Sequence, residues 1–303
     1  MDKREKIIEL LDNQGPLTGK ELLEKIRIDE FSAWKICNSS ERVVTKTIGT
    51  RYLRLDRQVE GYARLSPSII REFYGYTVIG TEKNIHEIHM KAELLHQEIK
   101  EISKKKFELA QNVITKIVES QEASQIIKTG ASFIIAGDVA YEMSHLEPRP
   151  EASTGELVKG SDLDIVVVTQ GLPDSIINAL DLAIYDQKNF LLKNPSYNEE
   201  IDYIIKDISK VKEQLKFNNF KSMVASKILY EGKFLYGNFS IFKQIRKMLI
   251  DEGIPEKIRT LEEKALINRN NARTYLLNYE GSKLTEEENM KLFYTKEEKE
   301  EFF

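Results

Sequence analysis

Residues 161–168, with the sequence Ser-Asp-Leu-Asp-Ile-Val-Val-Val, constrain the fold of this chain more than any other segment. A short run of β-branched residues is typical of a strand that is buried on both faces. Because side chains alternate along a strand, Asp162 and Asp164 are predicted to lie side by side on one face, while Leu163 and Ile165 face the core. The sequence therefore predicts a sheet that holds two carboxylates together at the start of a buried strand.

Two neighbouring carboxylates repel each other, and a bound cation removes that repulsion. A third acidic residue, Asp202, lies in the apolar run 200–205, which is also predicted to be a strand. Three carboxylates can support two divalent ions, so Asp162, Asp164 and Asp202 are predicted to bind Mg²⁺ or Mn²⁺. Two alternatives stay open: the aspartate pair can simply cap a turn before a strand, and Asp207 lies close to Asp202 in the sequence.

The residues before this pair add an apolar strand at 131–136, which runs into the turn Gly137-Asp138. The chain therefore has, in order, a strand with a glycine turn, the Ser-Asp-Leu-Asp strand and a later acidic strand. This order resembles the polymerase-β-like nucleotidyltransferase superfamily. That superfamily includes minimal nucleotidyltransferases, kanamycin nucleotidyltransferase and bacterial cyclic-oligonucleotide synthases. The resemblance covers residues 131–238 and implies an α+β fold, in which a short mixed sheet is flanked by helices.

The resemblance also implies an enzyme that transfers a nucleoside monophosphate from an NTP or dNTP to a hydroxyl and releases pyrophosphate. Its two-ion Mg²⁺ or Mn²⁺ site would use Asp162, Asp164 and Asp202. The stretch 221–237 resembles the helix that follows the core in small family members. The residues implied in nucleotide binding are Gly137, Asp138, Ser161, Lys221 and Lys227.

Two features depart from the family pattern. Asp138 stands where the family has a serine that contacts the triphosphate, and an ionised carboxylate cannot donate a hydrogen bond to phosphate. Either Asp138 acts through a metal ion, or Ser161 or backbone N–H groups make the contact, or the site has lost activity. Residues 141–159 form a longer connection than usual, rich in Glu, Pro, Ser and Gly, and are predicted to be a flexible loop near the site.

Length and composition predict a folded, helix-rich chain of two or three domains, because 303 residues exceed one typical domain. The net charge of −4 gives no overall basic field, so any nucleic-acid surface has to be local. Cys37 is the single cysteine and, among apolar neighbours, is predicted to be a core residue. No apolar run reaches the ~18 residues of a membrane span. We therefore expect a cytoplasmic protein without a membrane partner.

The N-terminal part is predicted to contain three amphipathic helices, at residues 3–12, from 20 onward and at 29–37. Two β-rich runs follow, at 42–48 and 52–56. This order, three helices followed by a strand pair, predicts a winged helix-turn-helix module. Residues 42–74 carry seven Arg or Lys against three acidic residues, which favours contact with DNA or RNA phosphates. The alternative is a packing or dimerisation domain with a solvated charged face.

Four segments are expected along the chain: a winged helix-turn-helix-like domain at 1–80, a helical connector at 81–127, a nucleotidyltransferase core at 128–238, and a helical C-terminal lobe with its tail at 239–303. The lysine triplet 104–106 of the connector is predicted to be a solvated face, and contact with a nucleotide or a nucleic-acid backbone is the alternative. The C-terminal lobe is predicted to break at 253–255, where Gly and Pro stand close together.

The acceptor hydroxyl stays open between a nucleotide 3′-hydroxyl, which would give an oligonucleotide, and a protein or RNA hydroxyl. Tyr294 in the C-terminal tail is a candidate acceptor within the chain, and a docking tail is the alternative. By analogy alone, the combination of modules suggests phage defence or a toxin–antitoxin pair, with a protein partner or a homo-oligomer. The alternative function is a DNA-binding regulator whose nucleotidyltransferase domain senses a nucleotide and is catalytically weak.

Overall fold

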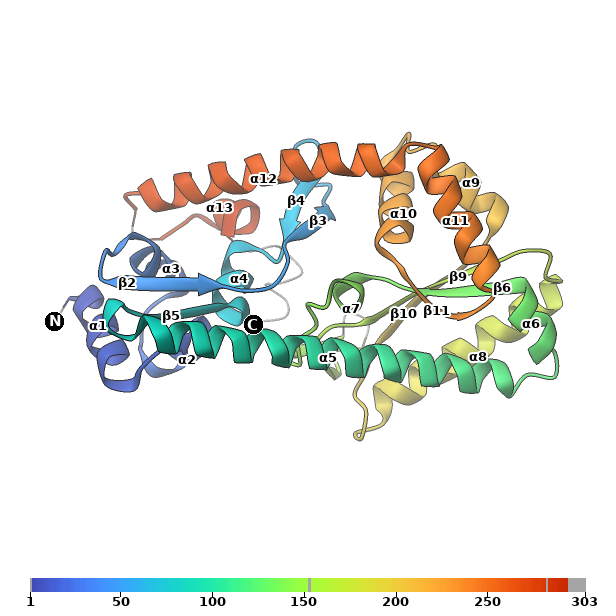
Figure 1. Ribbon diagram of the computed structural model, residues 1–303, viewed down its shortest axis with the longest axis horizontal. Helices are drawn as coiled ribbons and strands as arrows, with labels where there is room; N and C mark the ends of the chain where they lie inside the picture. The colour runs from blue at the N-terminus through green and yellow to red at the C-terminus, as the bar shows by residue number, and fades with distance from the viewer. Residues whose placement is uncertain (1, 152–153, 282, 294–303) are drawn as a thin grey trace. The chain divides into compact units, whose positions relative to one another are not determined.

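The computed structural model describes residues 2–151, 154–281 and 283–293. Its helices and small sheets make the fold α+β, as the sequence predicts (Figure 1). The chain divides into two compact units: unit 1 comprises Met1–Glu98 and Leu261–Phe303, and unit 2 comprises Ile99–Thr260. Both boundaries fall within long helices, α5 (Ile85–Glu119) and α12 (Ile254–Asn278). None of the described helices combines the length and apolar character that crossing a bilayer requires.

Unit 1 begins with three helices at the amphipathic stretches of the sequence. The second of them starts at a capping box, in which the Thr18 hydroxyl accepts from the Glu21 amide and the Glu21 carboxylate accepts from the Thr18 amide. The core of the unit surrounds Trp34, Phe73 and Phe293. The elements of this unit besides α5 and α12 are α1 (Lys3–Gln14), β1 (Leu17–Thr18), α2 (Gly19–Lys25), α3 (Glu30–Ser39), β2 (Val43–Thr47), β3 (Tyr52–Leu55), β4 (Ala63–Ser66), α4 (Ile69–Tyr76), β5 (Thr77–Thr81), η1 (Glu82–Asn84), α13 (Glu286–Glu288) and η2 (Asn289–Phe293).

The β-rich runs at 42–48 and 52–56 form strands β2 and β3, but these strands do not pair with each other. β2 pairs antiparallel with β5, where Val43 lies opposite Thr81, and β3 pairs with β4. β5 is buried along its whole length and bonds to β1 on its other edge, so it takes the central place in the sheet β1-β5-β2. The predicted strand pair is therefore corrected, because β4 and β5 supply the actual partners.

Unit 2 is built around a four-stranded mixed sheet with strand order β10-β9-β6-β11. β10 runs parallel to β9, whereas β6 is antiparallel to both β9 and β11. Its strands are β6 (Ala131–Ile135), β9 (Leu163–Thr169), β10 (Ile201–Asp207) and β11 (Lys233–Gly237). Its helices besides α5 and α12 are α6 (Ser124–Gly130), α7 (Gly137–Tyr141), α8 (Asp174–Lys193), α9 (Ile208–Gln214), α10 (Phe220–Glu231) and α11 (Phe239–Asp251).

The two faces of this sheet have different partners. Leu163, Ile165 and Val167 of β9 share one apolar core with Ile114 of α5 and Ile184 of α8. The first three side chains are at most 2% exposed, which confirms the predicted inward face of the strand. The aspartates of the same strand segment belong to the opposite face, because side chains alternate. Helices α9, α10 and α11 lie on the other side of the sheet from α8 (Figure 1).

The end of the stretch 221–237 differs from the expected continuous helix. α10 ends at Glu231, and Lys233–Gly237 forms the edge strand β11. Gly232 lies between the two elements, and a Cβ atom there would come within 2.4 Å of Ile134 Cγ2. Close packing against β6 therefore favours glycine at this junction. The break predicted at 253–255 falls at the junction of α11 and α12.

The segment 141–159, expected to be a flexible loop, contains a hairpin of β7 (Pro148–Pro150) and β8 (Leu157–Lys159). Arg149 lies opposite Val158, and the two residues are 9% and 1% exposed. Their burial fixes both strands of the hairpin against the rest of unit 2. The expectation of a flexible loop is corrected for the residues of these strands.

Candidate metal centre

Asp162, Asp164 and Asp202 come together at the N-terminal ends of two parallel strands. Asp162 directly precedes β9, Asp164 lies within β9, and Asp202 lies in β10 opposite Asp164. One ligand oxygen from each of the three residues falls within 4.8 Å of the others. The geometry thus supports the prediction that these residues can hold a metal ion.

The electrostatics of the cluster also favour a cation. Burial raises the pKa of Asp164 to about 8, with further contributions from the negative charges of Asp162, Asp138, Asp202 and Glu231. Burial likewise raises the pKa of Asp162, and the guanidinium of Arg149 opposes that shift. Carboxylates in such surroundings ionise readily only when a positive charge compensates them. A divalent cation with oxygen ligands provides that compensation.

Arg149 supplies a positive charge that sequence reasoning missed. The β7–β8 hairpin places its guanidinium in an ion pair with Asp162 and within 2.8 Å of Glu200 Oε2. The Nε–H group donates to the carbonyl of Gly160 at 2.9 Å, which fixes the direction of the side chain. One sequence signal was present: Arg149, between two prolines, is the only Arg or Lys from 142 to 158.

Gly137 begins α7 directly beside the aspartates, with a φ of +62°. A Cβ atom at this position would lie 2.0 Å from Asp164 Oδ2, so a side chain cannot be accommodated without moving the carboxylate. The Gly137 amide donates to Glu231 Oε1 at 3.3 Å. The predicted glycine turn is thus in contact with the carboxylate of Asp164 and with a further carboxylate from α10.

Asp138 and Ser161 interact with each other. The Ser161 hydroxyl donates to Asp138 Oδ2 at 2.7 Å, and the His145 amide donates to the same hydroxyl at 3.2 Å. In this arrangement the hydroxyl proton of Ser161 is engaged in the hydrogen bond to Asp138. Asp138 also adds negative charge at Asp164, so its side chain belongs to the acidic cluster itself.

The two predicted lysines of α10 occupy different surroundings. Lys227 is buried, pairs with Glu231 and lies 5.3 Å from the centre of the Tyr141 ring. Lys221 is exposed at the start of the helix. Six residues turn an α-helix by about 600°, so the two side chains point about 120° apart. Only Lys227 is therefore joined to the cluster, through Glu231.

Two further lysines, neither of them predicted as a site residue, support the strands that carry the aspartates. Lys188 of α8 lies 3.2 Å from Asp202 Oδ1. Lys106 of α5 is buried, pairs with Glu199 at 2.5 Å, and donates to the carbonyl of Lys159 at 2.8 Å. Lys106 thus joins the chain just before β9 to the chain just before β10, and the prediction of a solvated face is corrected for this residue.

Several arginines of the region 42–74 form ion pairs within unit 1. Arg42 lies 3.2 Å from Glu5, Arg64 lies 3.1 Å from Asp56, and Arg51 pairs with the buried Glu72. Pairing reduces the positive charge that these residues offer to a phosphate backbone. Tyr294, the candidate acceptor in the tail, lies outside the described residues.

The sequence matches no protein-family model, and no curated protein is significantly similar to it. The chemistry of the candidate site is therefore argued from its own residues: three clustered aspartates, an arginine paired with one of them, and a glycine turn packed against another.

Proposed function

We propose that unit 2 is a metal-dependent nucleotidyltransferase, which moves a nucleoside monophosphate from an NTP or dNTP to a hydroxyl and releases pyrophosphate. The observation that carries this proposal is the placement of Asp162, Asp164 and Asp202 on two parallel neighbouring strands, with ligand oxygens within 4.8 Å. Carboxylates of this kind suit a two-ion site for phosphoryl chemistry.

The donor set fits Mg²⁺ or Mn²⁺, because these ions prefer carboxylate oxygens. Burial, and after it the negative charges of Asp162, Asp138, Asp202 and Glu231, raise the pKa of Asp164 to about 8, and a bound cation would favour its ionised form. When bound, such ions would stabilise negative charge on the phosphates and lower the pKa of the attacking hydroxyl. Asp162 and Asp164 would hold both ions, and Asp202 would complete the site on the acceptor side.

Residues around the aspartates would orient the triphosphate. The Arg149 guanidinium has several donors and already binds two carboxylates, so it is suited to exchange one of them for a phosphate oxygen. Lys227 and the Gly137 amide both interact with Glu231 and would form a second group of donors. Glu231 would then position these donors, and Asp138 would act from within the acidic cluster.

The acceptor in this proposal is a nucleotide 3′-hydroxyl or a hydroxyl of protein or RNA. By analogy only, such chemistry suits phage defence or a toxin–antitoxin system. A nucleotide-sensing regulator with weak catalysis is the alternative, and the replacement of the family's serine by Asp138 is the observation that favours it. Either function is compatible with a DNA or RNA partner bound through residues 42–74, with a protein partner, or with a homo-oligomer.

The decisive experiment incubates the full chain with Mg²⁺ or Mn²⁺ and each labelled NTP and dNTP, and separates free nucleotide, oligomer and labelled protein. The Asp162→Asn plus Asp164→Asn protein is assayed beside it. Asp207→Asn is the matched control, because Asp207 caps α9 through the Ser209 amide and asparagine keeps that cap.

Incorporation that the double variant loses and the control retains would support the transferase and name the acceptor class. Incorporation that survives in the double variant would exclude these aspartates as the catalytic centre. If no nucleotide is incorporated but nucleotide still binds, the regulator becomes the better explanation.

A further inference from the structure

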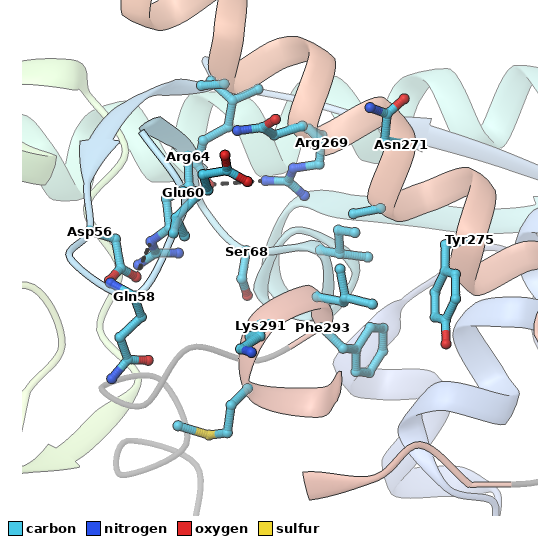
Figure 2. A pocket seen from close by; sticks show the side chains of 18 of the residues that line it. Asp56, Gln58, Glu60, Arg64, Ser68, Arg269, Asn271, Tyr275, Lys291 and Phe293 are labelled. Carbon is cyan, nitrogen blue, oxygen red and sulfur yellow. Dashed lines mark hydrogen bonds and ion pairs between the residues drawn. The ribbon is translucent and has the colours of Figure 1, made fainter. Parts of the chain in front are cut away.

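A cavity of about 620 Å³ lies within unit 1 and shares no residue with the aspartate cluster (Figure 2). Its walls come from the β3–β4 hairpin with its connecting loop, the first turn of α4, the unit 1 part of α12, and η2. Its volume falls in the range of small-molecule sites, about 300–1,000 Å³. A space of this volume can hold a small organic molecule.

One part of the cavity wall is apolar. Leu65, Ile69, Ala265, Ala272 and Phe293 line it, and most of these side chains are otherwise buried in unit 1. An apolar ligand surface placed there would leave water, which favours binding in proportion to the area covered. The cavity therefore suits a ligand with an apolar body.

The rest of the wall is polar and carries more positive than negative groups. Ser68, Asn268, Asn271 and Tyr275 provide neutral hydrogen-bonding groups. Figure 2 shows Arg269 and Asn271 on α12, and Arg64 and Ser68 on the elements across the cavity. The ionisable lining groups are Arg64, Lys264, Arg269 and Lys291 on the positive side and Asp56 and Glu60 on the negative side. Arg64 pairs with Asp56, and Lys291 pairs with Glu287 outside the lining, so Lys264 and Arg269 remain against Glu60. This balance favours a ligand with an acidic group.

The walls are held in place by hydrogen bonds that do not involve a ligand. The Asn268 side-chain amide donates to the carbonyl of Ala63 at 3.0 Å. The buried Arg269 guanidinium donates to the carbonyls of Leu65, at 3.3 Å, and of Pro67. α12 thus fixes the position of the hairpin, so the cavity is formed before any ligand enters, and little ordering entropy opposes binding.

We infer that this cavity is a binding site for a small organic anion with an apolar body. Lys264 and Lys291, both on the more exposed part of the lining, attract the acidic group, which competes with Glu287 for Lys291. The apolar wall receives the rest of the molecule. The inference concerns unit 1 alone and does not depend on the function proposed for unit 2.

The test uses a fluorescent aromatic sulfonate, 8-anilinonaphthalene-1-sulfonate, and its uncharged analogue N-phenyl-1-naphthylamine with the full chain. We expect saturable binding of one sulfonate molecule per chain and a rise in melting temperature with sulfonate concentration. Lys264→Gln plus Lys291→Gln should weaken sulfonate binding about tenfold and leave the uncharged probe unchanged. Lys6→Gln plus Lys46→Gln is the matched control, since both lysines are exposed and lie outside the cavity.

A second variant tests the location of the site. Ala272→Trp fills the cavity and should abolish binding of both probes, while Asp162→Asn plus Asp164→Asn should change neither. Circular dichroism and thermal unfolding establish that each variant is folded. The inference is overturned by unsaturable or absent sulfonate binding, by an equal loss in the two lysine pairs, or by unchanged binding in a folded Ala272→Trp protein.

Discussion

Asp164 of β9 lies opposite Asp202 of β10 in the parallel register of the two strands. These residues are 38 positions apart in the sequence, since 202 − 164 = 38, and helix α8 lies between them along the chain. Parallel pairing needs such a crossover connection. Two carboxylates that are distant in the chain therefore become neighbours. Burial, and then neighbouring negative charges that include Asp202, raise the pKa of Asp164.

The first prediction concerns Arg149, which compensates Asp162 and Glu200. Arg149→Met should lower the free energy of unfolding by about 3 kcal/mol without divalent ions, because it leaves partly buried carboxylates without their cation. Mg²⁺ should raise the melting temperature of the variant more than that of the original protein. Thermal unfolding with EDTA and with Mg²⁺ measures both effects.

Arg259→Met is the control for this substitution, because Arg259 forms an exposed pair with Glu256. Its removal should change the stability by less than about 0.5 kcal/mol. If Mg²⁺ stabilises the Arg149→Met protein no more than the original protein, Arg149 and the metal ion do not compete for the same carboxylates.

The second prediction concerns the close approach of Gly137 to Asp164. Gly137→Ala should destabilise unit 2 by about 2 kcal/mol or more and weaken Mg²⁺ binding, since the new methyl group would overlap Asp164 Oδ2. Gly171→Ala is matched to it, because Gly171 has a φ of +71° and nothing within 4 Å of an added Cβ. Mg²⁺ titration calorimetry of both proteins distinguishes the steric overlap with Asp164 from backbone strain at a positive φ. An equal loss of Mg²⁺ binding in the two variants would contradict the prediction.

The third prediction concerns the buried pair of Lys106 and Glu199. Lys106→Met should cost about 3–5 kcal/mol, because Glu199 remains buried without its partner. Adding Glu199→Gln to the same protein should restore part of this loss. Urea unfolding at neutral pH provides the measurement, and Lys105→Met, at a lysine with 70% of its side chain exposed, is the control that should have little effect.

The fourth prediction concerns Lys206, whose pKa burial lowers to about 8. An unfolded lysine keeps its proton up to about pH 10.4, so between these values the unfolded chain binds more protons than the folded one. The contribution of Lys206 to stability is therefore unfavourable below pH 8 and improves as the pH rises through this window.

Lys206→Met should accordingly be more stable at pH 7, by on the order of 2 kcal/mol, and should lack this improvement between pH 8 and 10. Urea unfolding at several pH values tests it against Lys210→Met, which removes an exposed lysine. A Lys206→Met protein that is less stable at pH 7 would show that the bond from Lys206 to Gln214, at 3.1 Å, outweighs the desolvation of the charge.

Local patterns were sufficient for the elements that carry the aspartates. The β-branched run after Asp164 predicts β9, and strand alternation predicts that Asp162 and Asp164 share a face, which the burial of Leu163 and Ile165 confirms. The unit 1 helices follow equally from amphipathic spacing and from the cap at Thr18. These features depend on neighbours within a few residues, so the sequence contains the information directly.

The partners of these elements were not predictable in the same way. β2 and β3 form at their predicted places but pair with β5 and β4, and β11 replaces the end of an expected helix. Strand pairing depends on which distant edges are available and on burial that only the assembled core provides. Local propensity therefore identifies a strand more reliably than it identifies the neighbour of that strand.

The sequence by itself determined that two aspartates share a strand face, that a glycine turn precedes them and that a third acidic strand follows. The tertiary structure alone decided that Asp202 lies opposite Asp164, that Arg149 pairs with Asp162, and that Lys106 is buried. The physical reason is the range of the forces: backbone alternation acts over a few residues. Ion pairing and desolvation instead depend on groups that meet only after folding.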